Sequence, residues 1–331
     1  MLTLVKADPE WKLLHRIADG LRPELQRELF AALDGLKHQI PTASLIDLIE
    51  NGELSRVLAE TKLTLPDLTA LTTALTVAVV ASANHVTASL TASLEMSFTL
   101  VNQRAVTWAE RYAGQLITEV NRETQKAVSE IVQRGFLEGV APRGQAIAIE
   151  QAVGNHPRHA QATFRYLDGL VQSGMSEKRA SEMSATYARR LLRHRAEMIA
   201  RTETMRASNM GQQLAWEAAA DQGLLVESEI RRVWIVTDDD RTCPRCLTLD
   251  DEQSELGGTF TEGNKEDWPD VPRRPSKTLK PKVPKKFRIP RKPKEDRTAR
   301  TPKGFIPQTV KTPPLHVGCR CSMGIVEVNT G

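Results

Sequence analysis

The sequence predicts a mostly α-helical protein, with a long helical N-terminal and central body and a small C-terminal α+β module. Aromatic residues are only 5% of the 331 residues, while Ala, Leu, Thr and Val abound, which favours helices. The stretch 67–141 contains no proline, and apolar residues such as Val120 and Ile131 recur there at helical spacing. Only near the C-terminal end do β-branched runs, 233–236 and 324–328, predict strands.

The boundaries of the expected helices follow from proline and glycine, which interrupt helices. Residues 1–65 hold short amphipathic stretches, such as 13–36. The later helices are expected at 143–153, 157–173 and 176–222. The expected breaks or ends are Pro9, Pro23, Pro41, Ala83–Asn84, Gly114, Gly135, Gly139, Arg201 or Gly211, and Gly223.

The run 71–83 is rich in Thr, Ala and Val and carries little charge. We interpret it as a helix buried between neighbouring helices. The alternative is a segment that perturbs membranes or faces another copy of the chain.

Several classes of protein are disfavoured by composition. No stretch of about 20 apolar residues occurs, so a membrane-spanning protein is not expected. The first residues lack the pattern of a secretory signal, and four cysteines are too few for a disulfide scaffold, so we expect a reducing compartment. Phosphate-binding loops, dinucleotide-binding glycine motifs and serine nucleophile motifs are absent, and no internal repeat is evident.

A basic, proline-rich arm interrupts the C-terminal module at residues 271–303. It carries a net charge of +12, against −8 for the remainder of the chain, and 11 of the 18 prolines lie between Pro269 and Pro314. We expect the arm to be extended and irregular. Its candidate nucleic-acid contacts are Arg273, Arg274, Lys277, Lys280, Lys282, Lys285, Lys286, Arg288, Arg291, Lys292 and Lys294.

Three interpretations of the arm remain open: a nucleic-acid contact, a contact with an acidic protein surface, and a solvated loop without a partner. Phosphate contacts would make nucleic-acid binding salt-sensitive. Aromatic residues for stacking on bases are scarce in the arm, so we expect little sequence preference.

All four cysteines lie in the module, in a pattern typical of a metal site. Cys243 and Cys246 form C-x2-C; after 69 intervening residues, His316, Cys319 and Cys321 form H-x2-C-x-C. Two cysteines on one tight turn can face one ion, and a second pair from a distant segment completes a tetrahedron, which predicts structural zinc. Five candidates compete for four positions, so the set is either three thiolates with His316 or four thiolates. Buried reduced thiols and disulfides are the alternatives.

We interpret the predicted zinc as a structural cross-link that joins the two ends of the arm. Carboxylates are near in sequence, at 238–240 and 250–252, but no H-x-E or H-E-x-x-H helix accompanies the cysteines. We therefore expect no enzyme activity, and a zinc-dependent nuclease or peptidase remains the alternative.

A second motif, A-R-T-E-T, occupies 200–204. Glu203 and Arg206 are three residues apart on the predicted helix and can pair. The pair is interpreted as an internal ion pair, as a docking contact to the module, or as two charges at the edge of an apolar stripe.

Together these pieces resemble the phage Mu F-like head morphogenesis family, which comprises minor head proteins of tailed phages. The similarity covers about 105–331. It rests on Arg201, Thr202 and Glu203 of the helix motif, on the strand residue Trp234, on Asp240 in an Asp-rich turn, on C-P-R-C-L-T-L-D and on P-P-L-H-V-G-C-R-C. The long basic stretch between the two cysteine pairs departs from the family pattern.

The resemblance implies a virion protein without enzyme activity, located in the capsid interior at the portal vertex and in the host cytoplasm during assembly. The implied partners are the portal protein, the major capsid or scaffold protein, viral DNA and other copies of the chain around the portal. A DNA-ejection protein with a membrane-active helix is a further alternative. The predicted division is a helical region 1–105 of unknown role, the helical part of the Mu F-like domain at 106–224, and the module at 225–331.

Overall fold

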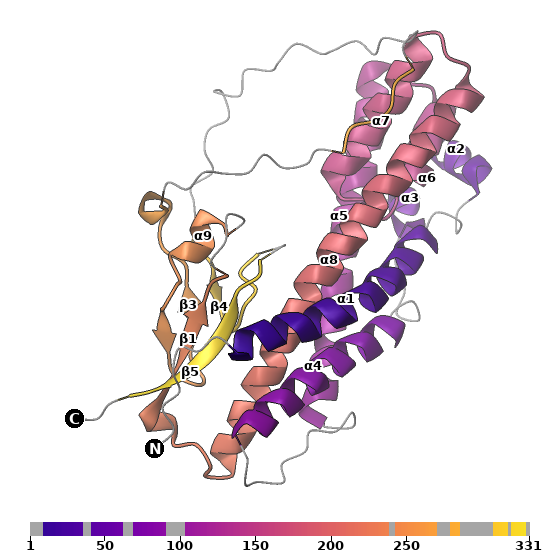
Figure 1. Ribbon diagram of the computed structural model, residues 1–331. Helices are drawn as coiled ribbons and strands as arrows, with labels where there is room; N and C mark the ends of the chain where they lie inside the picture. Colours follow the sequence, from indigo (N-terminus) through magenta and orange to yellow (C-terminus); the bar gives the residue numbers. More distant parts are fainter. Residues whose placement is uncertain are drawn as a thin grey trace.

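The computed structural model describes residues 9–35, 41–61, 69–90, 103–237, 242–269, 279–284, 307–316 and 319–328. It confirms a mostly helical chain with a few strands toward the C-terminus (Figure 1). The helices are α1 (Pro9–Gly35), α2 (Thr42–Glu50), α3 (Leu54–Glu60), α4 (Thr69–Leu90), α5 (Gln103–Glu138), α6 (Pro142–Ala152), α7 (Pro157–Gln172), α8 (Glu177–Asp221) and α9 (Pro244–Leu247). The strands are β1 (Ile230–Ile235), β2 (Gln253–Ser254), β3 (Phe260–Thr261), β4 (Thr309–Val310) and β5 (Ser322–Glu327).

The long helix α8 organises the helical body. Helices α1 and α4 pack along one half of it, and α5, α6 and α7 gather around the other half (Figure 1). Their apolar faces form one continuous core, in which side chains such as Leu33, Val79, Ile131 and Leu192 are almost completely buried. Burial of apolar area therefore accounts for most of the stability of this part of the chain.

Helix α4 contains the run 71–83 and is buried, as the first interpretation predicted. Val79, Ser82, Ala83 and Val86 are all less than 3% exposed. Within the part of the chain that the structure describes, no helix has the length and apolar character needed to cross a membrane.

Several predicted breaks are wrong because packing overrides the local signals. Helix α1 runs through Pro23, α4 runs through Ala83–Asn84, and α5 runs through Gly114 and Gly135. Helix α8 is also continuous at Arg201 and at Gly211. A Cβ on Gly211 would lie 2.1 Å from the carbonyl oxygen of Val79, so this glycine allows close approach of α4 to α8.

The predicted ends at Gly139 and Gly223 agree with the structure. Each glycine follows a helix and has a positive φ, of 67° and 72° respectively. Pro142 and Pro157 stand in the first turn of their helices, where a missing N–H costs no intrahelical hydrogen bond.

The C-terminal module is built on a small antiparallel sheet in the order β2-β1-β5. Val233 pairs with Gly324, and Trp234 pairs with Met323. Trp234 is fully buried, and its ring packs edge-on against Phe260 of β3 at 5.3 Å. A second pair of strands, β3 and β4, is antiparallel with Phe260 opposite Val310.

The pairing of β3 with β4 closes the base of the basic arm. The arm follows β3 in the chain and returns at β4, and the N–H of Glu262 donates to the carbonyl of Gln308 at 3.0 Å. Segment 279–284 of the arm lies beside α7 and α8, far from the module (Figure 1).

Candidate metal centre

The first two predicted ligands lie on a one-turn helix. Pro244 occupies the first turn of α9, and Cys243 is its N-cap, whose sulfur accepts a hydrogen bond from the Cys246 N–H at 3.4 Å. This tight turn brings the sulfurs of Cys243 and Cys246 within 3.4 Å of one another. The C-x2-C spacing therefore acts as we expected from the sequence.

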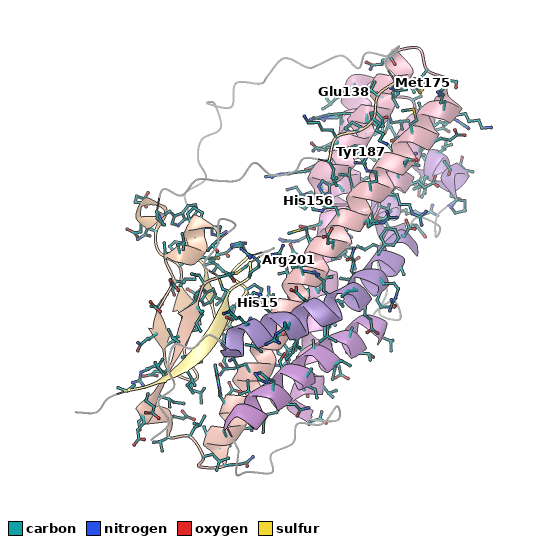
Figure 2. The ribbon with its side chains drawn as sticks, in the orientation of Figure 1. His15, Glu138, His156, Met175, Tyr187 and Arg201 are labelled. Atoms are coloured by element: carbon teal, nitrogen blue, oxygen red, sulfur yellow. The ribbon has the colours of Figure 1, made fainter. Side chains whose placement is uncertain are left out.

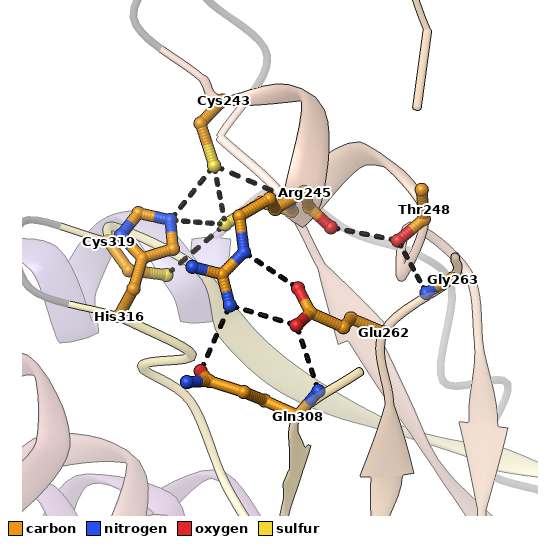
Figure 3. Close-up of polar contacts among 9 residues, drawn as sticks. Cys243, Arg245, Thr248, Glu262, Gly263, Gln308, His316 and Cys319 are labelled. Atoms are coloured by element: carbon orange, nitrogen blue, oxygen red, sulfur yellow. Dashed lines mark hydrogen bonds and ion pairs between the residues drawn. The ribbon is translucent and has the colours of Figure 1, made fainter. Parts of the chain in front are cut away.

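The other three candidates come from the segment between β4 and β5. His316 Nε2 lies 2.8 Å from the sulfur of Cys243 and 3.2 Å from that of Cys246 (Figure 3). The sulfur of Cys319 lies 3.6 Å from that of Cys246. Cys321 belongs to a group with Cys246 and Cys319 whose ligand atoms are all within 4.8 Å.

Cys246 is shared by both groups of ligand atoms. One group is Cys243, Cys246 and His316, and the other is Cys246, Cys319 and Cys321. Zinc–sulfur bonds of about 2.3 Å place tetrahedral sulfurs about 3.8 Å apart, close to the 3.4 and 3.6 Å found here. The chemistry of these donors, thiols with one imidazole, fits zinc, and Cys319 and Cys321 adjoin the first group through Cys246.

The ionisation of the four thiols is strongly coupled. The hydrogen bond from Cys246 lowers the pKa of Cys243 to about 4, and the same contact raises the pKa of Cys246. Hydrogen bonds with Cys246 and Cys321 likewise lower the pKa of Cys319. The hydrogen bond with Cys319, together with burial, raises the pKa of Cys321 above its usual value. Neighbouring thiolates repel each other. A bound divalent cation would offset this repulsion, so that all four thiols could ionise together.

The pocket around these sulfurs is lined by Thr237, Thr242, Cys243, Cys246, His316, Cys319, Arg320 and Cys321. None of these described lining residues is a carboxylate. Asp250, one of the acids near in sequence, instead accepts a hydrogen bond from the N–H of Val236 at 3.3 Å, just beyond β1. Asp240 lies outside the described residues.

An ion pair beside the cysteines joins the turn of Cys243 and Cys246 to the segments before and after the arm. Arg245 makes two hydrogen bonds with the fully buried carboxylate of Glu262, at 2.7 and 2.9 Å (Figure 3). It also donates to the side chain of Gln308 at 3.0 Å. Bidentate pairs of this kind are among the stronger charged contacts, so the arm's base is held by charge as well as by strand pairing.

Arg232, which we did not single out from the sequence, is fully buried at the centre of the module. Its guanidinium donates to the carbonyls of Glu255, Gly258 and Lys311, to the Ser254 hydroxyl and to the Gln213 side chain. Burial lowers its pKa to about 10, so it remains charged at neutral pH. In the sequence it stands directly before the predicted strand 233–236, next to Arg231, and nothing local marks it as buried.

The module contacts α1 through β5, and it makes hydrogen bonds along one stripe of α8. Asn209 donates to the carbonyl of Cys321 at 3.2 Å, and Gln213 donates to that of Leu256 at 2.8 Å. Glu217 pairs with Lys311 at 3.0 Å. These three polar residues follow each other every four positions, a helical spacing that could have been recognised in the sequence.

The Glu203–Arg206 pair lies on a different face of α8. Glu203 is 5% exposed and accepts a hydrogen bond from Arg206 at 3.2 Å. The Arg206 guanidinium also lies over the ring of Tyr112 of α5, at 5.1 Å. The pair is therefore internal and faces α5, whereas the contact with the module is made by Asn209, Gln213 and Glu217.

Two other members of the A-R-T-E-T motif, Arg201 and Thr202, are also placed by the structure. The Thr202 hydroxyl donates to the carbonyl of Met198 within α8. Arg201 lies on the side of the bundle toward the module, as does His15 of α1 (Figure 2). Of the eleven candidate nucleic-acid contacts, Lys280 and Lys282 are described and both are exposed; the other nine lie outside the described residues.

Comparison with known proteins identifies one family. Residues 165–324 match the model of the family described as Phage Mu protein F like protein. No curated protein and no solved structure matches the chain significantly. The matched region begins in α7, includes α8 and every candidate metal ligand, and ends within β5, the last strand of the docked module. Residues 165–324 of this chain are therefore similar to the phage Mu protein F-like family.

Proposed function

We propose that this protein is a minor head component of a tailed phage that acts by binding rather than by catalysis. Its family indicates a protein of phage head morphogenesis. In this proposal the helical body binds the portal protein and the major capsid or scaffold protein, and the basic arm binds packaged DNA inside the capsid. Several copies would surround the portal.

The observation that carries the proposal is that β3 and β4, which flank the basic arm in the chain, pair with each other inside the region that matches the family. The arm, with its net charge of +12, lies in the chain between the paired strands β3 and β4. Phosphates attract such a segment without reading base sequence, because the attraction is electrostatic. A closed loop on a docked module would present this charge at a defined place on the head.

A structural zinc ion is part of the same proposal. Cys243, Cys246 and His316, with Cys319 or Cys321, would hold it. The ion would supply a cross-link between the segment that precedes the arm and the segment that follows it. Purified protein should then contain about one zinc ion per chain under reducing conditions; absence of metal, with four titratable thiols, would remove zinc from the proposal.

Two binding experiments test the proposal. The first is a pull-down with the portal, capsid and scaffold proteins of the same phage; retention of none of them would contradict the role of the helical body. The second compares DNA retention by the full chain with retention by a chain lacking residues 271–303. A control chain keeps the arm's length but carries Gln in place of its Lys and Arg residues. If both altered chains retain DNA as well as the original does, the arm has no role in DNA binding.

A further inference from the structure

The described part of the basic arm is held by two tyrosines. The Tyr187 hydroxyl donates to the carbonyl of Leu279 at 3.1 Å, and the Tyr166 hydroxyl donates to the carbonyl of Lys282. The two rings, from α7 and α8, pack edge to face with centroids 5.4 Å apart. Burial raises the pKa of both phenols, so both hydroxyls keep their protons and act as donors.

The segment held there has the sequence of a polyproline ligand. Residues 281–284 read P-K-V-P, and the two bound carbonyls, of Leu279 and Lys282, are three residues apart. A polyproline II helix has three residues per turn, so carbonyls at this spacing lie on one side of it. Recognition of a P-x-x-P segment on aromatic side chains is an established mode, because the ligand is extended before it binds.

The arm repeats this unit, contrary to the expectation that the chain has no internal repeat. P-x-x-P occurs at 272–275, 281–284 and 290–293, a spacing of nine residues. Only the central unit has apolar residues at two equivalent positions, Leu279 and Val283. Leu279 packs against the core of the helical body, whereas Lys280 and Lys282 are exposed. Packing of Leu279 thus selects the central unit.

The tyrosine site also lies among uncompensated cations. Arg165 precedes Tyr166 on α7 and is exposed, and the charge of Arg190 acts on the Tyr187 phenol. Within the described part of the chain, neither arginine and neither exposed lysine of the docked segment forms an ion pair with a carboxylate. A cationic strand on a cationic surface needs neutral anchors, which the tyrosine hydroxyls provide, and the joint surface is complementary to a polyanion.

We propose that Tyr166 and Tyr187 form an intramolecular binding site for a polyproline strand. The site holds unit 281–284, so that this unit and the α7–α8 surface form a single cationic face for the DNA backbone. The DNA part rests on the proposed function of the arm. The docking part does not, because it concerns contacts within the chain.

Limited digestion of the full chain with trypsin tests the docking. The bond between Lys282 and Val283 is cleaved only from the undocked state, whereas the bond between Lys280 and Pro281 resists trypsin in any state. Changing both Tyr166→Phe and Tyr187→Phe removes two hydrogen bonds and should speed cleavage after Lys282 by about tenfold or more. Tyr112→Phe is the matched control, because Tyr112 contacts Arg206 and makes no hydrogen bond to the described residues of the arm.

A Leu279→Asp chain provides a second test with both tyrosines intact, and it should also be cleaved faster. Unchanged cleavage in both altered chains would overturn the docking site. DNA binding by the same chains, measured with a short mixed-sequence duplex over a range of salt concentrations, tests the shared face. The double tyrosine change should weaken binding and flatten its dependence on salt.

Two further outcomes separate this inference from the proposed function. If cleavage speeds up while DNA affinity stays the same, the docking site holds and the shared cationic face is wrong. If deletion of 271–303 leaves DNA retention unchanged, the arm's DNA role fails, but the digestion result still decides the docking site.

Discussion

The helical body and the C-terminal module achieve their folds by different means. The body buries apolar side chains along helices of up to 45 residues. The module has strands of only two to six residues, and its interior holds three buried cysteines, the fully buried Arg232 and the buried carboxylate of Glu262. Short strands cannot bury enough apolar area, so polar cross-links take over that role. Substitutions of the cysteines and of Arg232 should therefore destabilise the module, whereas changes in helix packing should destabilise the body.

The largest effect is expected from Cys246→Ser, because Cys246 belongs to both groups of candidate ligands. Structural zinc contributes about 10–16 kcal/mol of apparent binding free energy to the folding of small domains. We expect loss of bound metal and of the module's tertiary structure, while the helical circular dichroism signal persists. Metal analysis and fluorescence of Trp234 would measure both.

Cys319→Ser and Cys321→Ser form a matched pair in the same experiment. The residue that ligates the metal should lose it on substitution, and the other should retain most of it. If Cys246→Ser leaves the module intact, the cysteines are packing residues and the contrast with the body disappears.

The second largest effect is expected from Arg232→Met, which keeps much of the side-chain volume and removes the donors. Several buried acceptors would lose their partner, at about 1–3 kcal/mol each, so the free energy of unfolding of the module should fall by at least about 3 kcal/mol. Urea unfolding followed by tryptophan fluorescence would measure it. Arg232→Lys is the conservative control and should recover only part of the loss, because an ammonium group has fewer donors. A loss below about 0.5 kcal/mol for Met would show that the network is dispensable.

A packing change should affect the body instead. Gly211→Ala would press a Cβ against the Val79 carbonyl of α4, and we expect a loss of about 2 kcal/mol in the unfolding free energy. The control is Gly114→Ala in α5, where a Cβ meets nothing within 4 Å. That change should instead stabilise the helix by about 0.5–1 kcal/mol. Equal effects at the two glycines would contradict the close approach of α4 and α8.

A further expected effect is a pH dependence of the body. His159 packs near His156 and His194, with ring centroids 5.9 and 6.4 Å away. Burial, together with these histidines and Arg195, lowers the pKa of His159 to about 4. The unfolded chain takes up this proton near pH 6.5, so the stability due to neutral His159 is present above that pH and is lost as the pH falls toward 4.

The Tm of the helical signal should therefore fall between pH 6.5 and 4 in chelator-treated protein, and it should fall less in His159→Gln. Chelation separates this effect from acid release of metal by the module. An identical slope in both chains would show that another group controls the acid response of the body.

Local patterns in the sequence determined the helical class, the ends of helices at Gly139 and Gly223, and the pairing of Cys243 with Cys246 on one turn. These features depend on residues within a few positions of each other, which is where propensity and spacing act. The charge of the arm and the spacing of its prolines are likewise local. The family resemblance rested on such short motifs, and the family match over 165–324 agrees with it.

Only the tertiary structure decided the features that depend on distant parts of the chain. Pro23 and Gly211 lie inside helices because packing against α8 and α4 outweighs their local preference. Arg232 is buried because acceptors from three separate segments meet around it. The docking of Leu279 on Tyr187, 92 residues away, could not be inferred from spacing, because such a contact exists only after the intervening helices and strands have packed.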